Sequence, residues 1–263
     1  MQNDPGMTKY LKHVLVLFFS FALAACYEVN EDVVINENGS GIFNSKIDLS
    51  QMMEMMQSFA GDEELTKNGL DKPLDTVLSM QSLLDAADPK EKQENAWMKD
   101  GQVTVKMNLK EKLLKMSIRI PYQNFSQLEK LMEGQGTLFN QSFKGIMNGG
   151  NKPAASQDSV DDAGFQDLVG LYKVNLQNGL ISRKVDSVKF RDFMMKSQVT
   201  DLKQMAAQGM EINYTTSFKL PRMVKNVNNP LLKVSDDKRT VTIRYNLLDV
   251  VNDAAKYSYN IEY

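Results

Sequence analysis

The chain has 263 residues, of which 42% are hydrophobic and 24% are charged, and its formal net charge is −2. A chain of this length can bury a core without disulfides, and its single Cys excludes a disulfide framework. The near-neutral mixture of charges argues against nucleic acid as a partner, because a nucleic-acid-binding protein needs a basic face.

Residues 1–25 are predicted to be a secretory signal peptide. Lys9 and Lys12 form a short basic start, and a mostly apolar run follows over residues 14–21. A membrane-spanning helix needs about 20 apolar residues, so this shorter run favours a cleaved signal. Cleavage removes Lys9, Lys12 and Asp4, which leaves 29 basic and 32 acidic residues and a net charge of −3.

The end of this segment, Leu23-Ala24-Ala25-Cys26, resembles the lipobox of bacterial lipoproteins. The resemblance implies that the Cys26 thiol receives a diacylglycerol, that the chain is cut before Cys26, and that the new amino terminus takes a further acyl chain such as palmitate. Two or three acyl chains anchor a protein stably, whereas one does not. We expect an envelope protein with a lipid anchor and no transmembrane helix. The alternative is an ordinary signal peptide followed by an unmodified Cys.

The residues after Cys26 bear on the location of the protein. Many lipoproteins that stay in the inner membrane carry Asp at the next position, and this chain carries Tyr27, which favours the outer membrane. The sequence favours neither the periplasmic face nor the surface face of that membrane. Glu28, Glu31 and Asp32 could form a sorting signal for the outer surface.

The mature chain has few reactive side chains. Its single His, His13, lies in the predicted signal peptide, and Cys26 is committed to lipid. The mature protein therefore lacks the groups for Ser-His-Asp or Cys-His catalysis, for an imidazole proton shuttle, and for ordinary zinc, haem or iron–sulfur sites. We predict that it is not an enzyme and has no metal and no cofactor. A hydrolase with two carboxylates is a distant alternative, since such a pair needs neither His nor Cys.

Residues 27–48 are predicted to form a β-hairpin around the turn Asn36-Glu37-Asn38-Gly39. A helix follows, because Asp48 and Gln51 resemble a capping box and the next apolar residues share one helical stripe. The stripe consists of Leu49, Met52, Met53, Met56, Phe59 and Ala60.

This methionine-rich stripe has two interpretations. It is either the core-facing side of a helix or an adaptable apolar surface for lipid or peptide, because methionine side chains mould to irregular ligands. The second interpretation makes five residues the candidate apolar binding surface: Leu49, Met52, Met53, Met56 and Phe59.

The middle of the chain alternates between predicted helices and strands. A helix is predicted over residues 73–87, followed by a charged, solvated connection at 90–94. Strict alternation of apolar and polar residues predicts strands at 103–110 and 114–122, with one face in water. Residues 124–132 are expected to be helical.

Residues 149–164 are rich in Gly, Ala, Ser and Asp and are predicted to be a linker. It divides the mature chain into an N-terminal half at 26–148 and a C-terminal half at 165–263. The second half is expected to contain one hairpin, two helices and three further strands. These are a hairpin from Leu168 around Asn178-Gly179, a helix from Asp186, a short helix at 202–207, strands at 210–220 and 240–247, and a last strand at 257–263. A duplicated hairpin-then-helix unit would explain the order in both halves, and coincidence is the alternative.

These patterns predict an α+β fold with antiparallel sheets that have one solvated face, helices packed on the other face, and two halves that could be related. Tyr257, Tyr259 and Tyr263 form an aromatic stripe on the last strand. Such a stripe is either a binding face or, more often, the core side of the strand.

A second resemblance concerns the C-terminal strands. Phe218-Lys219-Leu220-Pro221 with Val224, Val227 and Asn228, followed by the strand at 240–247, is similar to the pattern of the LppM-like lipoprotein domain. The opening hairpin at 27–48 also fits that family. The resemblance implies an envelope-facing α+β domain with lipid or glycolipid binding, and it brings no catalytic residues.

Three tripeptides are similar to an O-glycosylation sequon of some Gram-negative bacteria: Asp75-Thr76-Val77, Asp158-Ser159-Val160 and Asp186-Ser187-Val188. The triplet with Ser159 lies in the predicted linker. We expect it to be the only accessible one, so Ser159 is the candidate glycosylation site.

The sequence as a whole favours a membrane-anchored envelope lipoprotein that acts as a non-enzymatic binding module. Its predicted partners are the membrane, through the lipid anchor, and a lipid, a glycolipid or another envelope protein. A structural or assembly lipoprotein without a small ligand is the alternative.

Overall fold

A computed structural model describes residues 26–51, 53, 57, 73–87, 89–134, 165–207 and 211–263. The predicted signal peptide at 1–25 and the predicted linker at 149–164, with Ser159, lie outside these residues. So do three members of the candidate binding surface, Met52, Met56 and Phe59.

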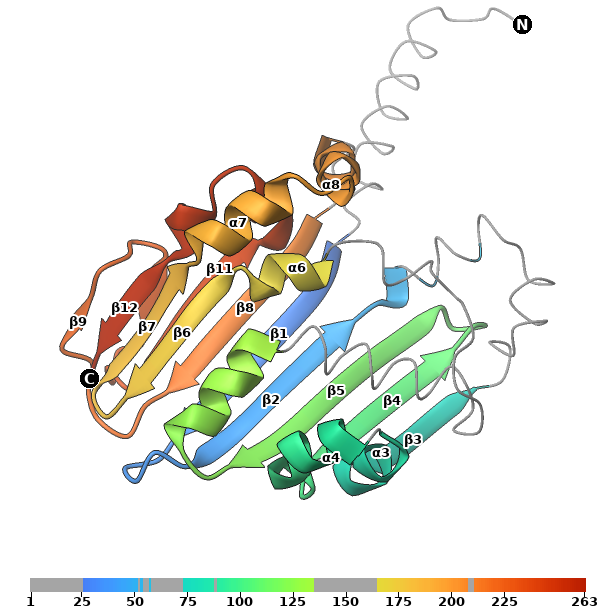
Figure 1. The fold of residues 1–263 in the computed structure, drawn as a ribbon, viewed down its shortest axis with the longest axis horizontal. Coiled ribbons are helices and arrows are strands. Elements are labelled where there is room, and N and C mark those ends of the chain that lie inside the picture. The colour runs from blue at the N-terminus through green and yellow to red at the C-terminus, as the bar shows by residue number, and fades with distance from the viewer. Residues whose placement is uncertain are drawn as a thin grey trace, which may run out of the picture.

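Two sheets with helices around them form the fold (Figure 1), which confirms the α+β class. The strands of the larger sheet are β1 (Cys26–Ile35), β2 (Gly41–Asp48), β3 (Leu74–Ser79), β4 (Gln102–Asn108), β5 (Leu113–Tyr122), β8 (Glu211–Lys219), β10 (Leu232–Val234) and β11 (Thr240–Asn246). Those of the smaller sheet are β6 (Tyr172–Gln177), β7 (Leu180–Val185), β9 (Asn226–Val227) and β12 (Tyr259–Glu262). Their orders are β10-β11-β8-β1-β2-β5-β4-β3 and β6-β7-β12-β9.

The opening hairpin is confirmed as β1 and β2, which pair from Glu28 and Asp48 to Ile35 and Gly41. Gly39 has a φ of +79°, which suits glycine in the turn. Gly41 leaves no room for a side chain, because an added Cβ would lie 1.8 Å from the Val34 carbonyl oxygen.

The predicted pair of alternating strands is confirmed as β4 and β5. Every second side chain of β5 from Leu114 to Tyr122 is buried, and the residues between them are half-buried or exposed. β8 and β11 show the same alternation. One face of the larger sheet therefore covers the core and the other is polar and solvated, as expected.

The helix predicted over residues 73–87 is wrong in its first half. Residues 74–79 form β3 at the edge of the larger sheet, and α3 (Met80–Ala86) begins only after them. The side chain of Ser79 caps this helix by accepting a hydrogen bond from the Ser82 amide at 3.1 Å. Burial alternates along β3, so pairing with β4 outweighed the helical spacing of its apolar residues.

The connection predicted at 90–94 is also wrong, because these residues belong to the helix α4 (Pro89–Asn95). The expectation of solvation holds, since α4 has no buried residue. A short 3₁₀ helix, η1 (Ala96–Met98), then brings Trp97 back against the core.

The larger sheet contains one parallel pair, β1 with β8, in which Cys26 lies opposite Glu211. The prediction of antiparallel sheets therefore holds for the smaller sheet and not for all of the larger one. More than 180 residues separate the paired residues of β1 and β8, so their direction depends on how the chain returns and not on a local pattern.

Strands from both sides of the predicted linker share the larger sheet. The helix at residues 125–134, which confirms the helix expected at 124–132, also joins the two parts. Its Glu129 and Glu133 side chains accept hydrogen bonds from the Leu176 and Val174 amides of β6, at 2.6 and 2.8 Å. These bonds cover backbone donors on an edge strand. A duplication of the two halves stays a prediction.

The C-terminal part contains α6 (Phe165–Gly170), α7 (Ser187–Met194), α8 (Gln198–Ala207) and two 3₁₀ helices, η3 (Leu247–Val251) and η4 (Ala254–Tyr257). The hairpin β6–β7 and the two predicted helices are confirmed. Leu168 lies in α6 and not in a strand.

The predicted strand at 257–263 begins later, because Tyr257 ends η4 and β12 starts at Tyr259. Tyr257, Tyr259 and Tyr263 are at most 2% exposed, so these tyrosines face the core. Phe218 of β8 contacts Tyr259 of β12 edge-on, with ring centroids 6.2 Å apart. The two sheets therefore pack on each other through aromatic side chains.

Candidate functional site

Cys26 is the first residue of β1, in the middle of the larger sheet. Its backbone position lies opposite Glu211 of β8. Tyr27, the next residue, is already buried in the core at 8% exposure. A lipid on Cys26 would therefore be attached to the folded domain without a flexible tether. We name the end of the larger sheet where β1 and β8 begin the anchor end.

The predicted helix after Asp48 starts at the anchor end and is fixed to β5. Asp48 Oδ1 accepts a hydrogen bond from the Ser50 amide at 3.0 Å, as a capping residue does. The Leu49 amide donates to the Leu114 carbonyl oxygen at 2.8 Å, and the Ser50 hydroxyl accepts from the Leu114 amide at 3.2 Å. The first turn thus extends the hydrogen bonding of the sheet.

Asp48 also forms an ion pair with Lys115 of β5, with 2.9 Å between carboxylate oxygen and Nζ. Burial works against the charge of this carboxylate. The hydrogen bonds from Ser50 and Lys115 outweigh that effect and lower the pKa of Asp48. The cap is therefore charged at neutral pH, which suits a helix N-terminus.

The candidate binding surface is only partly within the described residues. Met53 is 1% exposed, and Leu49 is half-buried and packs against the core. Met107 of β4 lies opposite Leu114 of β5, and both are buried, as is Leu109 in the following turn. We name Met53, Met107, Leu109 and Leu114 the apolar cluster. Met53 is on the inside, and the roles of Met52, Met56 and Phe59 stay predictions.

Arg183 is the centre of a buried polar cluster between the two sheets. Its guanidinium lies over the Tyr172 ring, 3.6 Å from the centroid, and donates to the Tyr245 hydroxyl at 3.1 Å. Tyr245 stacks on Tyr257, with centroids 4.6 Å apart. Arg183 lies on β7 and Tyr245 on β11, so this cation–π and hydrogen-bonded group joins the smaller sheet to the larger one.

Glu31 belongs to the same region and is 3% exposed. Its carboxyl group accepts hydrogen bonds from the hydroxyls of Tyr214 and Thr216, the second at 2.9 Å. Tyr214 lies directly opposite Tyr245 on β11, and their rings are 5.5 Å apart. Glu31 is therefore part of the core and not part of an exposed sorting signal. Glu28 is exposed and Asp32 is half-buried, and their role in such a signal stays a prediction.

Burial raises the pKa of Tyr214, Tyr245 and Tyr259. These phenols therefore stay neutral at physiological pH. Burial also works against the charge of Arg183, but Tyr245, Tyr259 and Tyr172 outweigh it and raise the pKa of Arg183. The arrangement suits a stable bridge between sheets. The alternation along β1 could have predicted that Glu31 is buried, because Glu31 lies on the same face of the strand as Val33 and Ile35.

We expect Glu31→Gln to lower the free energy of unfolding by about 1–3 kcal/mol, because the two carboxyl oxygens accept from Tyr214 and Thr216, whereas an amide has one acceptor oxygen and an NH₂ group that cannot accept. Glu28→Gln, on the exposed side of the same strand, should change it by less than about 0.5 kcal/mol. Urea unfolding followed by circular dichroism compares the two. Equal stability of both variants would show that the buried carboxyl group is not needed.

The sequon-like triplets are more accessible than expected. In the triplet at Asp186, Ser187 is exposed and Val188 is 56% exposed. In the triplet at Asp75, Val77 is 61% exposed, whereas Thr76, which would carry the sugar, is half-buried. The expectation that only the linker triplet is accessible is therefore wrong. Glycosylation at Ser159 stays a prediction.

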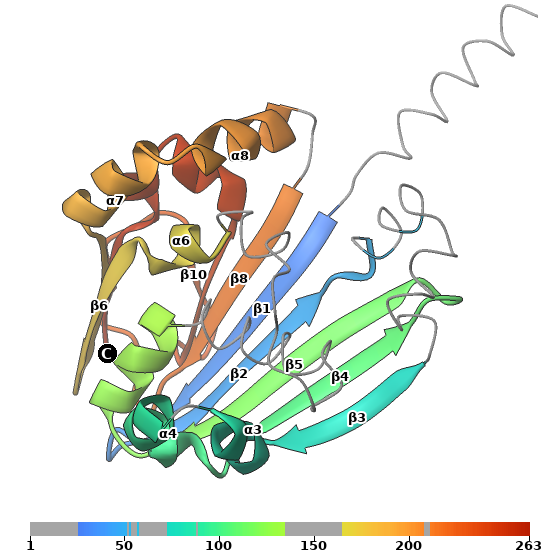
Figure 2. The same ribbon diagram turned by 45° about the vertical axis from the view of Figure 1, so that its right-hand side comes forward.

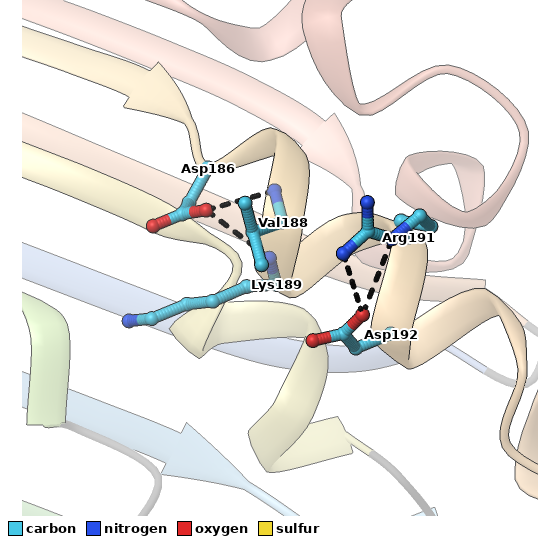
Figure 3. Close-up of polar contacts among 5 residues, drawn as sticks. All are labelled: Asp186, Val188, Lys189, Arg191 and Asp192. Carbon is cyan, nitrogen blue, oxygen red and sulfur yellow. Dashed lines mark hydrogen bonds and ion pairs between the residues drawn. The ribbon is translucent and has the colours of Figure 1, made fainter.

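Asp186 already has a structural role at α7 (Figure 3). Its Oδ1 accepts hydrogen bonds from the Val188 and Lys189 amides, at 3.0 and 3.1 Å. These bonds, above all the one from Lys189, lower the pKa of Asp186. Further along the helix, Arg191 and Asp192 form an exposed ion pair at 3.4 Å. Asp186 therefore acts as the N-cap of α7.

In the described part of the chain, no three His, Cys, Asp or Glu side chains gather in a way that could hold a metal ion. None of the helices in the described ranges is both long and apolar enough to cross a membrane.

No protein family and no curated protein matches the sequence. One match among solved structures is the NMR structure of the folded domain of the LppM protein of Mycobacterium tuberculosis. It covers 90% of this chain and 88% of that chain, with 10% sequence identity and a TM-score of 0.31. Similarity at this level does not establish a shared family, so membership of the LppM-like family stays a prediction.

Proposed function

We propose that the protein is a bacterial envelope lipoprotein, anchored through Cys26, that binds a lipid, a glycolipid or another envelope protein and catalyses no reaction. The observation that carries this proposal is the position of Cys26. It is the single Cys of the chain, it ends the lipobox-like segment, and it is the first residue of β1. The single His, His13, precedes Cys26, so a chain cut before Cys26 carries no imidazole for catalysis.

The apolar cluster supports the binding part of the proposal. The Leu49 amide donates to Leu114 and the Ser50 hydroxyl accepts from it, so the start of the helix that carries Met53 is fixed to β5. Methionine side chains such as Met53 and Met107 are unbranched and polarizable, and they can rearrange around an acyl chain. The bound chain would lie between the helix and the sheet, near the anchor end.

Native mass spectrometry of residues 27–263, purified gently from cells, tests this binding. We expect an additional mass of several hundred daltons that organic extraction removes, because acyl chains bury enough apolar surface to remain bound. Met53→Gln should reduce this mass, since it places an amide in the apolar cluster. Met195→Gln is the matched control, because Met195 is 77% exposed and should leave binding unchanged.

A structural or assembly role is the second candidate, and the tight burial of Met53 and Leu114 favours it, at 1% and 4% exposure. In that case the cluster is simply core. A protein that stays free of ligand after incubation with envelope lipids would support this role against lipid binding. Crosslinking in the native membrane would then be expected to capture an envelope protein.

A further inference from the structure

The anchor end carries more than Cys26. β2 ends there at Asp48, which lies opposite Lys115 of β5. β5 begins two residues further out at Leu113, so the turn between β4 and β5, with the exposed Lys110, projects beyond the end of β2. Since Asp48 lies opposite Glu28, two residues from Cys26, this turn is near the level at which β1 starts.

On the other side of β1, α8 lies at the same end. Both views place α8 near the start of β1, and α7 leads into α8 from the side of the smaller sheet (Figures 1 and 2). α8 ends at Ala207, four residues before Glu211, which lies opposite Cys26. α8 also packs against η3, which directly follows β11. The helices and the β4–β5 turn therefore flank the central strand that begins with Cys26.

The outer side of α7 is apolar at both of its ends. Val188 and Met195 are 56% and 77% exposed. They are seven residues apart, so they lie on one side of the helix, with the exposed ion pair Arg191–Asp192 between them. Apolar side chains among charged ones are typical of a helix that rests in the headgroup region of a membrane.

From these positions we infer that the anchor end, through α7 and the β4–β5 turn, is the surface that lies against the lipid headgroups. This inference rests on the proposed anchor at Cys26. β1 begins at Cys26 and Tyr27 is already core, so acyl chains on Cys26 hold this end at the bilayer. Met195 and Val188 then contact the interface, and the Lys110 ammonium meets the phosphates.

The opposite end of β1 gives an internal reference. A strand of ten residues spans about 30 Å. The turn that follows β1, with the exposed Glu37, is therefore held about 30 Å from the start of the strand. A protein standing on its anchor end has Met195 and Lys110 near the bilayer and Glu37 far from it.

The test uses the full lipidated protein, produced with its own signal peptide and reconstituted into vesicles of phosphatidylethanolamine and phosphatidylglycerol. The vesicles contain a lipid with a quencher on its headgroup. Met195→Cys, Lys110→Cys and Glu37→Cys each offer one thiol for a fluorescent dye, since the Cys26 thiol is occupied by lipid. All three side chains are exposed, and thermal unfolding checks that each variant is folded.

We expect the dyes at positions 195 and 110 to be quenched several-fold more than the dye at position 37. Equal quenching at all three positions, in protein that floats with the vesicles, overturns the membrane-facing surface and leaves the anchor intact. Stronger quenching at position 37 than at the other two positions likewise overturns the membrane-facing surface and leaves the anchor intact. Protein that does not float with the vesicles overturns the anchor, and the inference falls with it.

Discussion

Cys26→Ala should remove the lipid from the protein and release the processed chain from the membrane fraction. Cys26 offers the only thiol of the chain for a diacylglycerol. Each buried CH₂ of an acyl chain contributes about 0.8 kcal/mol to membrane binding, so the loss of two or three chains is not compensated by the weak contacts of the anchor end. Metabolic labelling with palmitate and intact mass, combined with membrane fractionation, measure the effect.

Ser20→Ala is the control for this experiment, because it changes the apolar run of the predicted signal peptide and leaves Leu23 to Cys26 intact. It should be labelled and fractionate like the unchanged protein. A Cys26→Ala chain that still takes up palmitate, or that stays in the membrane after its signal peptide has been removed, would contradict the lipobox assignment.

Arg183→Ala should lower the free energy of unfolding by about 3–5 kcal/mol. The substitution leaves a cavity beside Tyr172, deletes the hydrogen bond to Tyr245 and removes the cation–π contact, and each loss occurs in a buried site. In a chain of this size, each kcal/mol lowers Tm by about 2–4 °C. Urea and thermal unfolding of the lipid-free Cys26→Ala protein measure the change.

Lys184→Ala is the matched control, since Lys184 is the next residue of β7 and is exposed. It should change the free energy of unfolding by less than about 0.5 kcal/mol. If Arg183→Ala were as stable as Lys184→Ala, Arg183 would not be the bridge between the two sheets. The near-ultraviolet circular dichroism of the surrounding tyrosines would then also be unchanged.

Local sequence patterns predicted an element correctly where one turn or one alternating face was enough to define it. The hairpin at 27–48 needed only its Asn-Gly turn, and β4 and β5 needed only their strict alternation. Residues 73–87 were harder, because Leu74 and Leu78 fit both helical and extended spacing, whereas Val77 fits only the helical one. The partner strand β4 decided between them.

By itself, the sequence determined the lipobox-like segment that ends at Cys26, the single His and single Cys of the chain, and the solvated face of the larger sheet. Each depends on residue identity or on a local period. The tertiary structure decided the parallel pairing of β1 with β8, the contact of Arg183 with Tyr245, and the burial of Glu31. These features bring together segments more than 60 residues apart in the chain. No local period records such pairings, because they depend on how the two sheets pack.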